Sequence, residues 1–196
     1  MSSPTDLPGV FTQGETRTPV GDWHSVLMTS ELSSQCDLER MVFCKCTNDV
    51  RHEFILIHFR HPVQRHAVAV LVPDRTSRVE CTENNGGLFR SVGQASVLSP
   101  SVSQVLAHDT ISTTFNNPSA LESYLTQRYR SYRYHYYLDF PASARPLAMQ
   151  VSVLLCVLSK HSPTYQLWQY QCYWYGMHTL FGRPSRGFLM GARRPP

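Results

Sequence analysis

The stretch that decides the fold is residues 52–60, which read H-E-F-I-L-I-H-F-R. Its centre consists of β-branched and aromatic residues, the types that strands favour. Asn48-Asp49 precedes it and His61-Pro62 follows it, and both pairs are turn signals. The sequence therefore predicts the strongest strand of the chain here, and we expect its neighbours to pair with it.

Four further segments have the composition of strands. They are residues 25–30, 41–47, 67–72 and 109–115. Residues 67–72, A-V-A-V-L-V, are continuously apolar, which is typical of a central strand, and Pro73-Asp74 is expected to close it. The earliest of these strands is expected to have His24 at its entrance. Together the segments predict an antiparallel sheet of about five strands.

Helical patterns dominate the later part of the chain. Asn117-Pro118 is typical of a helix start, because asparagine caps helices and proline suits the first helical position. A second helix is expected after Pro146, where residues 147–158 carry one apolar stripe. A third is expected after Ser162-Pro163. This order predicts an α+β domain, with the sheet packed by two or three C-terminal helices.

The ends of the chain differ in composition from its middle. Residues 1–20 are rich in Pro, Gly, Ser and Thr, so we expect a disordered leader. Residues 183–196 hold further Gly and Pro and are expected to form a flexible tail. Residues 21–182 then form a single globular domain, which agrees with a hydrophobic content of 42% over the whole chain.

Composition and missing motifs narrow the class of protein. A net charge of +4, with only 16% charged residues, argues against a dedicated nucleic-acid binder. No apolar run reaches the roughly 18 residues that a membrane span needs. The start lacks the features of a secretory signal, so we expect a cytoplasmic protein whose six cysteines are free thiols. No phosphate-binding glycine motif or H-E-x-x-H occurs, so no cofactor or metal is expected.

The densest aromatic run, residues 165–181, reads Y-Q-L-W-Q-Y-Q-C-Y-W-Y-G-M-H-T-L-F and has Cys172 at its centre. A cysteine in the first turns of a helix is stabilised as the thiolate, the reactive form of the side chain. Histidine is the usual base for such a nucleophile. The candidate bases are His24 beside Trp23, His52 and His58 on the strongest strand, and His66 at the start of another strand.

A histidine at a strand start, further strands, an apolar helix and then Y-x-L-x-x-x-x-C-x-W-Y follow one another in this order. This order resembles the circularly permuted papain-like fold of lecithin:retinol acyltransferase-like and NlpC-type thiol proteins. The resemblance implies Cys172 as nucleophile, His24 as base and a polar residue on the next strand that orients the base. His52, Glu53 and His58 are all open for that last role.

Two positions near the cysteine extend this comparison. Gln171 stands where members of that family carry asparagine, and Tyr175 is the aromatic residue three positions after the nucleophile. The chain as a whole also resembles proteins of mushroom-forming fungi in which a C-Y-W-F/Y segment closes a domain of this size. The fungal resemblance implies one compact domain and no particular activity.

Two functions follow as hypotheses. The first is a cofactor-independent cysteine hydrolase or acyltransferase that forms a thioester on Cys172, with an acyl or other small-molecule substrate. Trp23, Gln171, Trp174 and Tyr175 would then contact the substrate. The alternative is a non-enzymatic domain whose aromatic residues line a pocket for a small molecule or a protein. In that case Cys172 is buried packing, a common state of free cysteines.

Two other motifs are interpreted as structural. Cys44-Lys45-Cys46 places two thiols on one face of a strand, and we expect packing because zinc sites need a second pair of ligands. Residues 128–137, R-Y-R-S-Y-R-Y-H-Y-Y, could stack on RNA bases. The favoured interpretation is a helix or strand at the sheet edge, with arginines stacked on tyrosines.

Overall fold

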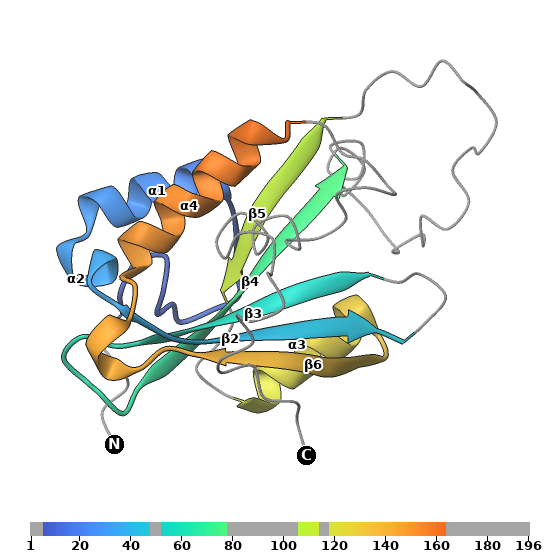
Figure 1. The fold of residues 1–196 in the computed structure, drawn as a ribbon, viewed down its shortest axis with the longest axis horizontal. Coiled ribbons are helices and arrows are strands. Elements are labelled where there is room, and N and C mark those ends of the chain that lie inside the picture. The colour runs from blue at the N-terminus through green and yellow to red at the C-terminus, as the bar shows by residue number, and fades with distance from the viewer. Residues whose placement is uncertain (1–5, 48–51, 78–105, 114–117, 164–196) are drawn as a thin grey trace, which may run out of the picture.

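The computed structural model describes residues 6–47, 52–77, 106–113 and 118–163. A six-stranded antiparallel sheet with the order β1-β5-β4-β3-β2-β6 forms its centre (Figure 1). The strands are β1 (Thr16–Pro19), β2 (Asp37–Cys46), β3 (Glu53–Arg60), β4 (Val68–Ser77), β5 (Ala107–Thr113) and β6 (Tyr132–Asp139). The helices are α1 (Val20–Thr29), α2 (Glu31–Ser34), α3 (Pro118–Tyr129), α4 (Ala148–His161) and the short 3-10 helix η2 (Ala142–Ala144). The α+β class and the antiparallel sheet are thus confirmed.

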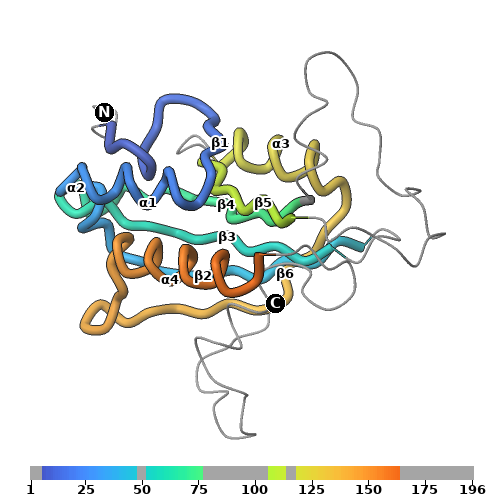
Figure 2. The backbone as a smooth tube through the Cα atoms, turned by 90° about the horizontal axis from the view of Figure 1, so that it is seen from above, coloured from blue at the N-terminus to red at the C-terminus, as the bar shows by residue number. Residues whose placement is uncertain are grey.

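Helices cover both faces of the sheet. Helices α1 and α4 lie side by side on one face (Figures 1 and 2), where Trp23 and Leu155 pack with Ile57 of β3. Helix α3 covers the other face, where Leu125 and Tyr129 pack on the sheet. The inward residues of α3 recur every three or four positions, and most of its polar residues face outward. Two apolar cores result, one on each side of the sheet.

The sheet divides along its middle. Strands β3 and β4 pair only from Ile57↔Leu71 to Arg60↔Val68, whereas β4 remains paired with β5 up to Ser77. Beyond Leu71, β4 and β5 therefore diverge from β3 and β2 (Figure 1). The prediction that Pro73-Asp74 ends the strand is wrong. Proline is tolerated inside β4 because the strand has already lost its β3 neighbour at that point.

The N-terminal predictions also need correction. Residues 25–30, predicted as the first strand, lie mostly in helix α1, where Val20, Trp23 and Leu27 are buried at helical spacing. Residues 6–20, predicted as part of a disordered leader, belong to the fold. Leu7, Val10 and Phe11 are buried in the core and β1 pairs with β5, and this burial stabilises the segment in spite of its polar composition.

The position of the helices differs from the expectation as well. Helices α1 and α2 precede β2, so the helices are not confined to the C-terminal part. Helices α3 and α4 begin where the sequence predicts, at Pro118 and just after Pro146. The third predicted helix and the predicted tail lie outside the described residues. Within the described ranges, none of the helices combines the length and apolar character needed to cross a membrane.

Candidate functional site

A buried carboxylate, Asp74, lies where the sheet divides. The register of β4 and β5 places Asp74 opposite Thr110, and its side chain is only 2% exposed. Three basic side chains from separate elements surround it. Arg128 of α3 contacts Oδ2 directly, Arg17 Nη2 of β1 is 3.7 Å from Oδ2, and His52 Nε2 is 3.8 Å from Oδ1.

Arg128 is the principal partner of this carboxylate. Burial alone would lower the pKa of Arg128, but the adjacent Asp74 carboxylate outweighs it and raises the pKa above its ordinary value. In such a buried ion pair, each partner compensates the charge of the other. The pair connects α3 to β4 at the point where β4 is still paired with β5 but no longer with β3.

His52 lies immediately before β3 and faces Asp74 across the division of the sheet. Its ring stacks on Tyr129, with centroids 5.5 Å apart and planes inclined by 17°. Burial lowers the pKa of His52 below 6.5; Asp74 opposes the shift and Arg128 adds to it. The imidazole is therefore neutral at pH 7. A proton on Nε2, toward the carboxylate, leaves the basic lone pair on Nδ1.

His24 lies on the opposite face, within helix α1 and not at a strand start. Its Nδ1 is 2.9 Å from Ser152 Oγ of α4. Because that hydroxyl donates its own hydrogen to the Met149 carbonyl, at 2.8 Å, its oxygen accepts from His24 Nδ1–H. The sheet separates His24 from His52, so the structure does not bring these two predicted site residues together.

Three other candidates have defined surroundings. Trp23 is buried, and its indole N–H donates to the Gly9 carbonyl at 2.7 Å. Glu53 is bound to Lys45, with 2.8 Å between Oε1 and Nζ. His58 points to the α3 face, where its Nε2 is buried and has no hydrogen-bond partner in the described part of the chain. The remaining predicted residues, Gln171, Cys172, Trp174 and Tyr175, lie outside the described residues.

The four described cysteines are poor nucleophiles. Burial raises the pKa of Cys36 to about 12 and that of Cys46 to about 11, with further increases from Asp37 and Asp74 respectively. The pKa of Cys44 and of Cys156 is also raised by burial. Cys44 and Cys46 pack together in the core beneath α3, as the structural interpretation of C-x-C predicts.

The arginine and tyrosine run forms the end of α3 and the edge strand β6, in agreement with the structural interpretation. β6 pairs with β2, with a bulge at His135 between the partners of Phe43 and Cys44. Arg40 of β2 lies over the Tyr137 ring, 5.5 Å from its centroid. Arg128, at the start of the run, is engaged with Asp74 and is not displayed for a nucleic acid.

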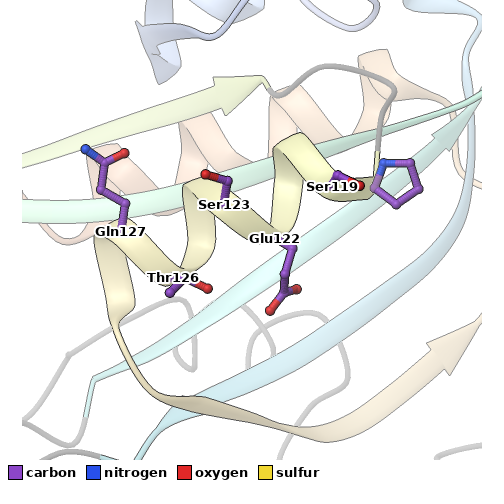
Figure 3. A pocket seen from close by; sticks show the side chains of 6 residues that line it. Ser119, Glu122, Ser123, Thr126 and Gln127 are labelled. Carbon is purple, nitrogen blue, oxygen red and sulfur yellow. The ribbon is translucent and has the colours of Figure 1, made fainter.

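Figure 3 shows a shallow pocket on the outer side of α3. Its lining comes from one helix and consists of Pro118, Ser119, Glu122, Ser123, Thr126 and Gln127. The pocket is open, its lining residues are mostly of polar types, and none of them is aromatic. It therefore differs from the aromatic pocket that the binding hypothesis expects.

Sequence reasoning missed Asp74 and Arg17. Asp74 follows a proline, a pattern typical of a turn, and Arg17 falls in a segment predicted as disordered. The alternation of Thr16, Arg17 and Thr18 is the signal that could have identified β1. No family model matches the chain, and neither a curated protein nor a solved structure matches it.

Proposed function

We propose that this protein is a cysteine-dependent hydrolase or acyltransferase in which Cys172 is the nucleophile and His52 is the base. The observation that carries the proposal is the 3.8 Å separation between His52 Nε2 and the buried Asp74 carboxylate. A carboxylate at this distance stabilises, through its charge, the imidazolium that forms when a thiol proton is taken up.

The surroundings of the two histidines favour His52 over His24 as the base. His52 directly precedes a strand of the sheet and has a charged partner. Within the described residues, the hydrogen-bond partner of His24 is the Ser152 hydroxyl, which brings no negative charge to an imidazolium. A neutral His52 at pH 7 is also in the protonation state that a general base needs.

The proposed reaction proceeds in two steps. His52 Nδ1 removes the thiol proton as the Cys172 sulfur forms a bond to the acyl carbonyl carbon. The tetrahedral intermediate then expels the leaving group, which takes the proton from His52, and a thioester remains. Water or another nucleophile resolves the thioester, giving hydrolysis or acyl transfer.

The test is alkylation of the folded protein by iodoacetamide at pH 6, with each cysteine followed by peptide mass spectrometry. Cys172 is expected to react much faster than the four cysteines with raised pKa values. His52→Gln is expected to slow Cys172 by about a hundredfold. His24→Gln is the matched control and should leave the rate unchanged.

Two results would overturn the proposal. One is a Cys172 that reacts no faster than the cysteine of an unstructured peptide, which would favour a non-enzymatic binding domain. The other is a His52→Gln protein, shown to be folded by circular dichroism, whose Cys172 reacts at the native rate. A loss of rate in His24→Gln alone would move the role of base to His24.

A further inference from the structure

Within the described part of the chain, two guanidinium groups share the Asp74 carboxylate. Arg17 and Arg128 both face this single carboxylate, while His52 is neutral at pH 7. The adjacent Arg75 and Asp109 compensate each other, with 3.3 Å between Nη1 and Oδ2. Among the described residues, Asp74 is therefore the single carboxylate in ion-pair contact with both guanidinium groups, and Arg17, which is 35% exposed, is the one that faces solvent.

Arg17 is the guanidinium with spare capacity. Its Nε donates to Thr110 Oγ1 at 3.0 Å, whereas its Nη2 is 3.7 Å from Asp74, too far for a good hydrogen bond. The side chain is 35% exposed, so it extends from solvent to the buried carboxylate. Its terminal nitrogens are therefore oriented by Thr110 and remain available to an incoming group.

Arg128 adds a second donor on the inner side. Its Nη2 is engaged by Asp74, but its Nε is buried and has no hydrogen-bond partner within the described ranges. A buried donor without an acceptor is unusual in a folded protein. Two guanidinium groups with unused donors thus lie beside the carboxylate that His52 faces.

We infer that Arg17 and Arg128 form an anion subsite beside His52, and that the acyl substrate carries a carboxylate or phosphate group. This inference rests on the proposed function for the identity of the reaction, but not for the binding of the anion. An anion between the two guanidinium groups gives Arg17 a second negative partner and replaces its long contact with charge-assisted hydrogen bonds. Substrates without such a group lose this interaction.

Iodoacetate and iodoacetamide provide a matched pair of probes, because they deliver the same alkylation and differ in charge. The ratio of the iodoacetate rate to the iodoacetamide rate is expected to be higher for Cys172 than for free cysteine. Arg17→Gln should lower this ratio by about tenfold. Because Arg17 also lies beside Asp74, the charge preference is measured as the ratio of the two rates in the same protein. Arg65→Gln is the control, since Arg65 is an exposed arginine paired with Asp37 at another part of the surface.

Binding of inorganic phosphate to a Cys172→Ala protein separates the two proposals. We expect calorimetry to detect phosphate binding in this protein, and Arg17→Gln to abolish it. Arg17-dependent binding combined with an inert Cys172 would refute the reaction and retain the subsite. A reactive Cys172 without phosphate binding, and with a charge preference insensitive to Arg17, would refute the subsite and retain the reaction.

Discussion

His58 is expected to make the stability of this fold depend on pH. It lies on β3, opposite Arg40 of β2 and Val70 of β4. Burial lowers its pKa to about 4; Arg40 adds to the shift, and Glu39 and Asp139 oppose it. An unfolded chain binds a proton at this histidine near pH 6.5. Stability should therefore be fully present above about pH 6.5 and decrease as the pH falls toward about 4.

The magnitude follows from the difference between the folded and unfolded pKa values. Each pKa unit corresponds to about 1.4 kcal/mol. Proton binding at His58 stabilises the unfolded chain, so the free energy of unfolding should be lower by about 3 kcal/mol at pH 4. About 2 kcal/mol of this is already lost at pH 5. Domains of ordinary stability unfold with about 5–15 kcal/mol, so the loss is large enough to measure.

Urea unfolding at pH 7, 6 and 5 provides the assay, applied to the native chain, His58→Gln and His66→Gln. Between pH 7 and 5, the free energy of unfolding should fall by about 2 kcal/mol more in the native chain than in His58→Gln. His52 titrates in both proteins and cancels in the comparison. His66 is exposed, so His66→Gln should follow the native chain. Equal losses in the native chain and His58→Gln would show that His58 titrates normally and would refute the reasoning.

Three further predictions follow from the described contacts. Asp74→Asn should lower the free energy of unfolding, measured in urea, by about 3–5 kcal/mol, because it leaves a buried guanidinium without its counter-ion. Asp139→Asn, at an exposed ion pair, should lower it by at most about 1 kcal/mol. Leu125→Ala should cost about 2–5 kcal/mol as a cavity opens beneath α3, and Val157→Ala, at an exposed position, less than about 0.5 kcal/mol. As the pH is lowered, the rate of Cys172 alkylation should fall with a midpoint below pH 6.5, because burial lowers the pKa of His52. A midpoint at or above pH 6.5 would contradict a role for this histidine.

The central strands were predictable because runs of β-branched, aromatic and other apolar residues favour strands locally. Residues 52–60 and 67–72 are rich in β-branched residues, and their burial on both faces agrees with that composition. The error at residues 25–30 arose because a short apolar run does not distinguish a strand from a helix. Extending the window upstream to Val20 and Trp23 gives the helical spacing that the structure shows.

The candidate site was predictable only in part. His52 was one of several histidines on the predicted strands that could serve the site, but the sequence offered no reason to connect it with Asp74. Their contact depends on where β3 and β4 stop pairing, which local composition does not encode. The contacts of Arg17 and Arg128 with Asp74 likewise join residues far apart in sequence, and the strand register and the packing of α3 determine them.

The division of the sheet gives these observations a common physical cause. Past Ile57↔Leu71, β3 and β4 no longer exchange ladder hydrogen bonds, so a proline at position 73 costs nothing there. The diverging strands also leave room for polar side chains, and Asp74 enters from β4 while His52 enters from the start of β3. Since buried charges persist only when they are paired, Arg128 of α3 must accompany Asp74. The candidate chemistry therefore lies where regular pairing ends, and its polar groups contribute to the attachment of α3 to the sheet.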